Sequence, residues 1–389
     1  MTAAKHSQGR ERRLAALAAG GTGGHLFPAK ALAQALLARG WKVVLITDER
    51  GGGFGPDLPQ VEVYRISAGG LAGGGAVRKA RSLAKLAYGA FEAWSLLGRL
   101  KPAVAIGFGG YPSVPTILAA HRRRIPIVLH EQNQIAGRAN RLLAARAKVI
   151  AVSFPETRGL ESVAERLRVT GNPVRAAIAA LGSKPFGVPG ETDRLRLLVT
   201  GGSQGARVFN ELLPKALCRL PDDLKGRLRV VQQVRGDDLE SVAETYRACG
   251  IDCELKDFFD DMPERLAATH LLVCRAGAST ITELAAAGRP AILVPYPFAA
   301  DDHQTGNAHA FAQAGGGWVM PQHDLTPERL AERVAALLAD PGTLARASTA
   351  ARAFAEPDAA LRLADLIAET LDGDGQQLPA ERPGKEAAA

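Results

Sequence analysis

Near the start of this sequence, a histidine that could act as an acid or a base follows a short apolar run and a glycine-rich turn. The run from Leu14 to Ala19 leads into a glycine-rich turn at residues 20–24, and His25 follows at once. Such a residue would lie at a helix start beside the strand ends, where an open α/β sheet binds its ligands. Because the imidazole pKa lies near neutrality, His25 can act as a general base on a hydroxyl nucleophile. The alternative is a histidine that only caps the helix or bonds a backbone carbonyl.

The same strand, glycine turn and helix pattern occurs a second time. The run Leu195 to Val199 precedes a second glycine-rich turn at residues 201–205, and a helical pattern starts at Ala206. The backbone N–H groups of a helix start favour anionic ligands such as phosphates. Neither turn matches GxGxxG, and Asp48 is the one candidate for an adenosine-ribose ligand. A dehydrogenase is therefore a weak interpretation, while a purely structural turn remains an alternative for each copy.

Two polar residues of the second half suit the hydroxyl groups of a nucleotide-sugar. Glu283 closes the segment that begins at Cys274 behind another apolar run, and its carboxylate can accept hydrogen bonds from two ribose hydroxyls. Its spacing from Thr280 also fits a capping box, which is the structural alternative. Gln304 offers both a donor and an acceptor for sugar hydroxyls. The acidic pair before it favours a helix N-terminus, and we predict no metal there.

The composition predicts a globular protein with an anionic partner. The chain has 389 residues, enough for two domains, and 47% of them are hydrophobic. A net charge of +8 suits a phosphorylated substrate or an acidic lipid surface. Aromatic residues make up 5% and form no basic, base-stacking stripe, so we predict no nucleic-acid partner.

Cysteine usage and hydropathy bear on the compartment. The four cysteines lack paired spacing, which argues against a zinc site or a disulfide framework and favours a reducing compartment. The basic N-terminus with a short apolar run imitates a signal peptide but leads straight into the first glycine turn. No apolar stretch of about 18 residues appears, so we predict no membrane span.

Alternating short apolar runs and helical patterns predict an α/β fold with parallel sheets. The pattern restarts after a segment rich in proline and glycine. We predict a first Rossmann-like domain over residues 1–172, a linker over 173–193, a second such domain over 194–372 and a disordered tail over 373–389. The last helix could pack back on the first domain.

The segment from Gly69 to Lys101 mixes apolar and cationic residues as an interfacial helix does. Cations near an anionic leaflet add about 1 kcal/mol each, which gives a reversible hold. The alternative is an amphipathic helix packed on the sheet, and part of the segment must be that. The predicted membrane contacts are Leu71, Arg78, Lys79, Arg81, Lys85 and Trp94.

Seven motifs together resemble the MurG family of bacterial peptidoglycan glycosyltransferases, which belong to glycosyltransferase family 28. They cover nearly the whole chain in the family's order. They are GGTGGHLFPA from Gly20, GFGGYPSVP from Gly107, HEQN from His130, GNPVR from Gly171, GGSQGAR from Gly201, CRAGASTITE from Cys274 and DDHQ from Asp301.

The resemblance implies a GT-B fold, in which two Rossmann-like domains face a cleft, and an inverting enzyme without a required cofactor. N-acetylglucosamine would pass from UDP-N-acetylglucosamine to the C4 hydroxyl of the N-acetylmuramoyl group of lipid I, giving lipid II. The first domain would bind the lipid acceptor, with His25 near it as candidate base, and the second domain would bind the donor.

The family's motifs also imply roles for individual residues. Thr22, Gly23 and Gly24 would meet the donor's sugar or diphosphate, and Asn133 would contact the sugar. Arg175 and Ser203 would approach the diphosphate. Glu283 would bind the ribose and Gln304 the sugar hydroxyls, while Phe259 would offer a backbone contact to uracil. The backbone that would assist Glu283 belongs to Ala278, Ser279, Thr280, Ile281 and Thr282.

The resemblance further implies a peripheral protein on the cytoplasmic face of the inner membrane, with cell-wall and division-machinery proteins as partners. Two other interpretations stay open. One is a different GT-B nucleotide-sugar enzyme, such as a glycolipid synthase or an epimerase. The other is a non-catalytic scaffold of cell-wall assembly, although the set of polar site residues is intact.

Overall fold

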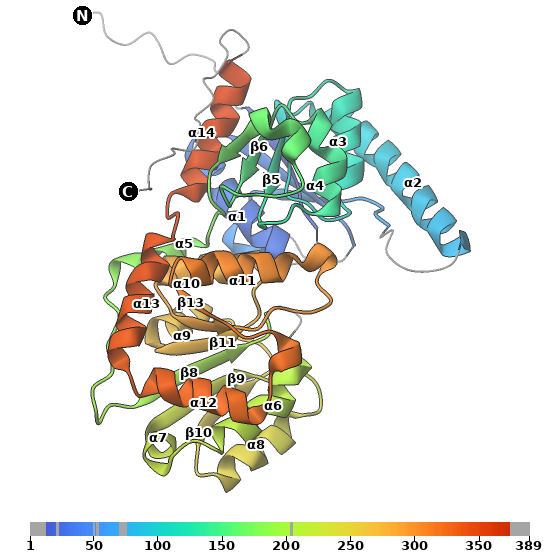
Figure 1. Cartoon of the computed structure of the whole chain (residues 1–389). Helices are drawn as coiled ribbons and strands as arrows, with labels where there is room; N and C mark the ends of the chain where they lie inside the picture. Colours follow the sequence, from blue (N-terminus) through green and yellow to red (C-terminus); the bar gives the residue numbers. More distant parts are fainter. Residues whose placement is uncertain are drawn as a thin grey trace, which may run out of the picture. The chain divides into compact units, whose positions relative to one another are not determined.

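The chain forms two compact units (Figure 1). The computed structural model describes residues 13–20, 23–49, 51, 54–69, 76–202 and 205–373, without the side chains of residues 56 and 76–80. One unit comprises the residues up to Pro173 together with those from Asp358 onward, and the other comprises Val174–Pro357.

The first unit contains a seven-stranded parallel sheet with the order β3-β2-β1-β4-β5-β6-β7. Most of its strands are apolar on both faces because helices cover both, while the edge strand β3 is partly exposed. Their bounds are β1 (Leu14–Ala18), β2 (Lys42–Thr47), β3 (Glu62–Arg65), β4 (Val104–Gly107), β5 (Ile127–Glu131), β6 (Val149–Val152) and β7 (Leu167–Val169).

Alternate residues of these strands face two separate cores. Leu17 and Ile106 point to α1 (Gly23–Ala38) and α14 (Ala359–Asp372). Ala16 and Leu129 point to the opposite side. The helices on that side are α2 (Ala76–Leu100), α3 (Ser113–Arg122) and α4 (Arg138–Leu143).

The second unit repeats the plan with a six-stranded parallel sheet in the order β10-β9-β8-β11-β12-β13. Its strands are β8 (Leu195–Thr200), β9 (Leu228–Gln233), β10 (Asp252–Lys256), β11 (Leu271–Cys274), β12 (Ala291–Leu293) and β13 (Gly317–Val319). One face carries α6 (Arg207–Leu217), α8 (Leu239–Ala248) and α12 (Pro327–Leu338). The other carries α5 (Ala176–Ala179), α9 (Met262–Ala268), α10 (Ala278–Ala287), α11 (His303–Gln313) and α13 (Pro341–Ala353).

Shorter elements complete both units. They are α7 (Asp222–Arg227) and the 3₁₀ helices η1 (Gly55–Asp57), η2 (Ala144–Arg146), η3 (Glu161–Arg166), η4 (Ala180–Ser183), η5 (Ala300–Asp302) and η6 (Gln322–Asp324).

Both sheets reverse their strand order at one point. The reversal lies between β1 and β4 in the first unit and between β8 and β11 in the second. In doubly wound sheets, ligands bind outside the carboxyl ends of the strands at such a switch point. The predicted α/β class with two Rossmann-like sheets is therefore confirmed, and each glycine turn follows a strand at a switch point.

The last helix belongs to the first unit. Leu363 and Ile367 of α14 are buried in the core that α1 shares. The Nζ of Lys148 donates to the carbonyl oxygen of Thr370 at 2.7 Å. The chain thus returns from the second unit at about residue 358.

The segment predicted as a linker is structured. Ile178 of α5 and Leu181 of η4 are buried in the core around α10, within the second unit. Prolines and glycines after residue 184 still prevent longer elements there.

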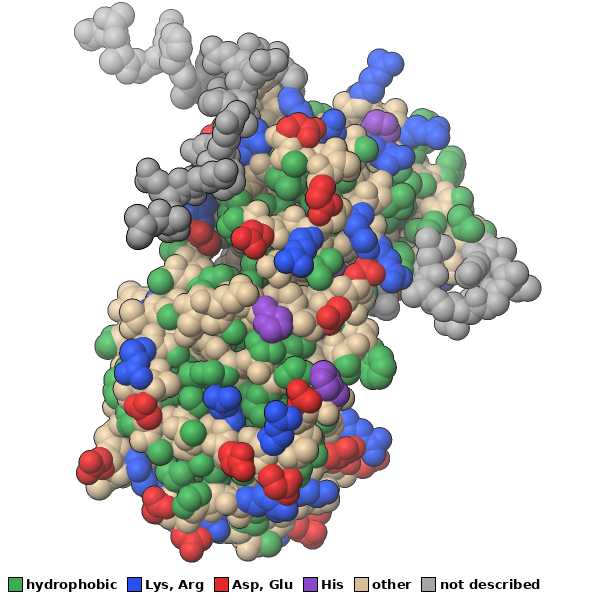
Figure 2. Space-filling model, viewed as in Figure 1, with side chains coloured by type: hydrophobic (Ala, Val, Ile, Leu, Met, Phe, Trp, Pro, Cys, Tyr) green, Lys and Arg blue, Asp and Glu red, His purple; other side chains and the backbone are tan. Residues whose placement is uncertain are grey.

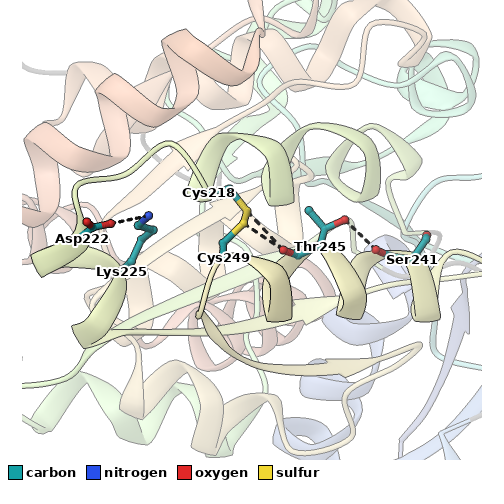
Figure 3. Close-up of a disulfide and its surroundings, with 6 residues drawn as sticks. All are labelled: Cys218, Asp222, Lys225, Ser241, Thr245 and Cys249. Atoms are coloured by element: carbon teal, nitrogen blue, oxygen red, sulfur yellow. Dashed lines mark hydrogen bonds and ion pairs between the residues drawn. A yellow bond between two sulfur atoms is a disulfide. The ribbon is translucent and has the colours of Figure 1, made fainter.

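A disulfide joins Cys218 to Cys249, so the prediction against disulfides is wrong (Figure 3). The two cysteines lie at the ends of α6 and α8, with Cα atoms 5.4 Å apart. Both sulfur atoms lie against the carbonyl oxygen of Thr245. Spacing along the chain could not reveal this pair because they are 31 positions apart and the packing of two helices brings them together. The cysteine argument for a reducing compartment loses its basis.

Candidate functional site

His25 lies in the first turn of α1 at the switch point of the first unit. Its ring packs on Gly109 and Gly110, which follow β4 and have φ angles of +86° and +75°. A Cβ atom on either glycine would come within 3.3 Å of a ring carbon. Glycine is therefore needed twice over, for the left-handed backbone and for the close approach of the imidazole.

A buried amide connects His25 to a second histidine. The Nδ1 of His25 lies 3.2 Å from the Oε1 of Gln132. The Nε2 of Gln132 donates to the carbonyl oxygen of Phe108 at 3.0 Å and lies 2.9 Å from the Nδ1 of His130. The Nε2 of His130 lies 3.1 Å from the carbonyl oxygen of Gly171. The alternative in which His25 bonds only a backbone carbonyl does not describe this arrangement.

His130 is neutral at physiological pH. Its side chain is fully buried in β5, and burial lowers its pKa to about 4, with a smaller contribution from the nearby His25. Desolvation disfavours the charged imidazolium more than its bond to a carbonyl oxygen can offset.

Glu131 positions Asn133, the residue predicted to contact the sugar. Its Oε1 accepts from the backbone N–H of Asn133 at 2.9 Å and from the Nδ2 of Asn133 at 3.2 Å. Its Oε2 accepts from the N–H of Gly137 and the Nδ2 of Asn140. Four donors satisfy this nearly fully buried carboxylate, which fixes the loop behind β5.

In the second unit, an ion pair joins two residues that the motifs had assigned to different parts of the donor. The Nε and Nη2 atoms of Arg175 lie 3.0 and 2.9 Å from the Oε1 of Glu283. The Oε2 of Glu283 has no hydrogen-bond donor within the described part of the chain. Burial raises the pKa of Glu283, and the charge of Arg175 and its hydrogen bond oppose this shift. One carboxylate oxygen is thus held while the other stays available.

The capping-box alternative for Glu283 is wrong. α10 begins at Ala278 after Gly277, and no side chain caps it. Glu283 therefore lies in the second turn of the helix, beyond the N–H groups that a capping box satisfies. Residues 278–282 form the first turns of α10 at this switch point and are buried or partly buried.

Gln304 keeps only half of its amide available. Its Oε1 accepts from the backbone N–H groups of Ala276 at 3.2 Å and Tyr296 at 3.0 Å. These two donors occupy both lone pairs of the oxygen, so the prediction that Gln304 offers an acceptor to the sugar needs correction. The NH₂ group remains as a donor. Asn307, one turn on, donates to the carbonyl oxygen of Ala276, so the two side chains hold both backbone polar groups of this residue.

The acidic pair before Gln304 shapes a turn. Asp301 and Asp302 have φ angles of +53° and +54°. The Oδ1 of Asp302 accepts from the hydroxyl of Thr305 at 2.7 Å, at the start of α11. Among the described residues, no group of three or more His, Cys, Asp or Glu side chains is arranged to hold a metal ion.

Of the remaining predicted site residues, some are located by the structure and others lie outside the residues that it describes. Gly23 and Gly24 open α1, and a Cβ on Gly24 would meet open space. Phe259 is buried beneath the guanidinium of Arg265, 4.2 Å from its ring. Thr22, Ser203 and Leu71 lie outside the described residues, as do the side chains of Arg78 and Lys79.

One side of α2 is apolar and exposed. Its large hydrophobic residues are 46 to 63% exposed and span roughly 140° of the helix at 100° per residue. They are Leu83, Tyr88, Phe91 and Trp94. The opposite side, with Ala93 and Leu97, packs on the sheet. Figure 2 shows hydrophobic side chains along the outer edge of this helix.

Basic residues accompany this apolar side. Arg81 and Lys85 on α2 are exposed. The guanidinium of Arg123 stacks on the Trp94 ring at 4.1 Å, between exposed Arg122 and Arg124. Among the described residues, no helix is long and apolar enough to cross a membrane.

Three residues of these sites were not predicted from the sequence motifs. Gln132 stands inside the HEQN motif, so its place beside two histidines was a usable signal. Arg275 is buried and donates to the carbonyl oxygens of Val294 and Pro295, which holds the loop before Gln304. Arg123 becomes adjacent to Trp94 only through packing.

Two doubly wound units, each with a glycine-rich turn and a helix start at its switch point, are the architecture of the GT-B fold. Two family models match this chain, the glycosyltransferase family 28 N-terminal domain over residues 15–152 and the family's C-terminal domain over residues 196–363. The chain belongs to glycosyltransferase family 28, and the predicted family and transferase class are confirmed.

Named relatives resemble the chain over nearly its whole length. A protein of Rhodospirillum centenum is 54% identical over 93% of this chain and 96% of its own. One of Rhodospirillum rubrum is 54% identical over 94% of each. Both are named UDP-N-acetylglucosamine--N-acetylmuramyl-(pentapeptide) pyrophosphoryl-undecaprenol N-acetylglucosamine transferase.

Solved structures agree with the fold. Acinetobacter baumannii MurG has a TM-score of 0.72 at 33% identity, over 92% of this chain and 99% of its own. A UDP-N-acetylglucosamine 2-epimerase has a TM-score of 0.66 at 15% identity, over 96% of this chain and 99% of its own, which shows the fold alone.

Proposed function

We propose that this protein transfers N-acetylglucosamine from UDP-N-acetylglucosamine to the C4 hydroxyl of the N-acetylmuramoyl group of lipid I, forming lipid II for peptidoglycan. The observation that carries the proposal is 54% identity, over 93% of the chain, to a relative named for this transfer. The epimerase interpretation has only a fold-level likeness in its favour.

The second unit binds the donor in this proposal. The available Oε2 of Glu283 accepts from the ribose hydroxyls, while Arg175 holds Oε1 and adds positive charge near the diphosphate. The NH₂ of Gln304 donates to a sugar hydroxyl. The N-terminus of α10 stabilises the negative charge that develops on UDP as the sugar leaves, so the mechanism requires no cofactor.

The first unit supplies the acceptor side and the base. The acceptor hydroxyl attacks the anomeric carbon once, which inverts an α-linked donor to a β-linked product. His25 takes the proton of that hydroxyl. Its place against Gly109 and Gly110, at the switch point, supports this role.

The apolar side of α2 contacts an anionic membrane surface in this proposal, since a polyprenyl substrate stays in the bilayer. Exposed aromatic residues flanked by cations are what an interfacial contact requires. Arg81, Lys85 and the run from Arg122 to Arg124 supply charge within the described residues.

The transfer itself is tested with radiolabelled UDP-N-acetylglucosamine and a short-chain lipid I analogue. UDP-glucose serves as the control donor. Selective transfer of N-acetylglucosamine supports the proposal. Donor binding without transfer would point to a scaffold, and release of free epimerised sugar nucleotide would point to an epimerase.

The membrane contact is tested by sedimentation with vesicles that contain anionic lipid. Phe91→Glu should lower the bound fraction severalfold because it places a carboxylate on the apolar side of α2. Leu361→Glu is the matched control, since Leu361 on α14 is 48% exposed in the same unit. Equal binding of both variants would remove α2 from the proposal.

A further inference from the structure

The Gln132 side chain lies between two histidines, with Oε1 3.2 Å from the Nδ1 of His25 and Nε2 2.9 Å from the Nδ1 of His130. We propose that Gln132 is a positioning residue that keeps the proton of neutral His25 on Nδ1, so that Nε2 is the nitrogen that accepts a proton. This inference rests on the proposed role of His25 as the base.

The orientation of the Gln132 amide follows from its surroundings. Its side-chain nitrogen lies 3.0 Å from the carbonyl oxygen of Phe108 and 3.1 Å from that of His130. Carbonyl oxygens only accept hydrogen bonds, so the NH₂ group must face them. A flipped amide would place oxygen against oxygen in a buried site. The Oε1 of Gln132 therefore faces His25.

The orientation of the amide then fixes the tautomer. An amide oxygen cannot donate, so the Nδ1 of His25, at 3.2 Å, must carry a hydrogen to make this bond. In a neutral imidazole the other nitrogen is then the acceptor. A Cβ on Gly110 would lie 3.5 Å from that Nε2, so the glycine leaves space beside it.

His130 holds the arrangement from the far side. Its Nε2–H donates to the carbonyl oxygen of Gly171 at 3.1 Å, which leaves Nδ1 to accept from the Nε2 of Gln132 at 2.9 Å. A protonated His130 would present a hydrogen to the Gln132 NH₂ group and disrupt the bond. Burial lowers the pKa of His130 to about 4, so the ring keeps the neutral form across the working range of an enzyme.

Other ionisable groups near His25 leave this assignment intact. Glu131 directs both carboxylate oxygens to Asn133, Gly137 and Asn140. Lys30 of α1 pairs with Asp57. The titratable and charged side chains of α1, residues 109–111, β5 and α4 are Lys30, Tyr111, His130, Glu131, Arg138 and Arg141.

The tautomer matters because a His25 with its hydrogen on Nε2 could not accept the proton of the acceptor hydroxyl at that nitrogen. In the serine-protease triad, a wrong imidazole tautomer lowers kcat by about 10⁴-fold although the geometry is kept. Gln132 is less polar than the carboxylate of such a triad. We therefore expect a smaller loss, about 10- to 10²-fold in kcat, when the amide is removed.

Nitrogen NMR of the full-length protein labelled with ¹⁵N-histidine tests the tautomer without reference to turnover. A His25→Asn variant assigns the His25 signals. The expected result, above neutral pH, is a protonated Nδ1 and an unprotonated Nε2 in the wild type. Gln132→Met, which fills similar volume without an acceptor, should shift the signals towards the Nε2–H form. A wild type with Nε2–H, or an unchanged tautomer in Gln132→Met, would overturn the inference.

The pH dependence of kcat tests whether Gln132 positions His25 or only stabilises the fold. Gln132→Met should lower kcat while the KM for UDP-N-acetylglucosamine stays within about twofold. Gln132→Glu should restore part of kcat and move the acidic limb of the kcat profile to higher pH, because a carboxylate raises the pKa of the imidazole it accepts from. The matched control is Gln232→Met, since Gln232 is equally buried and its Oε1 accepts from Tyr246 in the second unit. It should lower thermal stability and leave the pH profile in place.

The outcomes distinguish this inference from the proposed function. Absence of any transfer by the wild type would refute the proposed reaction, and the NMR result would still decide the tautomer. Full turnover in His25→Ala would refute the base role and the inference with it. Equal losses in Gln132→Met and Gln132→Glu, without a moved acidic limb, would leave Gln132 a structural residue and overturn the inference.

Discussion

The two switch points use the same backbone design for different chemistry. In the first unit, a glycine pair lets His25 approach closely, and the Gln132 amide connects it to the buried His130. In the second unit the helix start of α10 adjoins a charged pair, Arg175 and Glu283, and a donor amide, Gln304.

In the proposed mechanism, this difference separates two tasks that would interfere at a single site. A general base needs a pKa near neutrality, which a neighbouring cation would lower. A diphosphate leaving group needs positive charge and N–H donors close by. Distributing the two tasks over two similar units lets each environment suit its own group.

Removal of the His25 side chain is the most direct test of the proposed base in the first unit. His25→Ala should lower kcat by about 10²- to 10⁴-fold, the usual contribution of a general base, with little change in donor KM. Steady-state transfer to the lipid I analogue measures this. His121→Ala, an exposed histidine of α3, is the control. Near-normal turnover in His25→Ala would place the base elsewhere.

The neutral environment of the first unit should appear as a pH dependence of its stability. The folded pKa of His130 is about 4 and the ordinary value is 6.5, so between these values only the unfolded state binds the proton. The free energy of unfolding should therefore fall by about 3 kcal/mol as pH drops from 6.5 to 4. Hydrogen exchange of β5 amides would report it. His130→Asn should lack this contribution and His121→Asn should keep it, and parallel curves for all three would contradict it.

Removing the carboxylate of the second unit should affect donor use most. Glu283→Ala should lower kcat/KM for UDP-N-acetylglucosamine by about 10²-fold, because hydrogen bonds to a charged group contribute about 1.5–3 kcal/mol each. Glu240→Ala, a first-turn residue of α8, is a control that leaves donor use intact. A loss confined to kcat would instead assign Glu283 to the chemical step.

The smallest effect concerns selectivity. Gln304→Ala should reduce discrimination between UDP-N-acetylglucosamine and its epimer by about tenfold, as expected for one lost hydrogen bond. Competition between the two donors measures the ratio. Gln322→Ala tests whether the effect is specific, since Gln322 contacts Arg275 and not the α10 helix start. An unchanged ratio in Gln304→Ala would move the selectivity to another residue.

Most of the fold could be predicted because βα alternation is a local pattern. The apolar runs ending at Ala19 and Val199, each followed by glycines, indicated two Rossmann-like sheets, and both sheets are present. The return of α14 to the first unit was open at the sequence level, because an amphipathic helix does not state which sheet it covers. The Cys218–Cys249 bond was also missed, because it depends on how α6 and α8 pack together.

The sequence predicted individual residues of the candidate site but not the contacts between them. His25, Glu283 and Gln304 were each selected by their place after a strand or at a helix start. Their partners were not, since Gln132 is 107 residues from His25 and Arg175 is 108 residues from Glu283. The side of the Gln304 amide that stays available depends on two backbone N–H groups whose direction only the folded loop defines.

By itself, the sequence determined the family, the two parallel sheets and the positions at which chemistry can occur, because strand periodicity and glycine turns are written in neighbouring residues. Only the tertiary structure decided the protonation and orientation of those groups. Burial of His130, the acceptor that faces His25 and the ion pair of Arg175 with one oxygen of Glu283 all arise from residues far apart in the chain. Desolvation and hydrogen-bond direction depend on neighbours in space, and those neighbours exist only once the chain has folded.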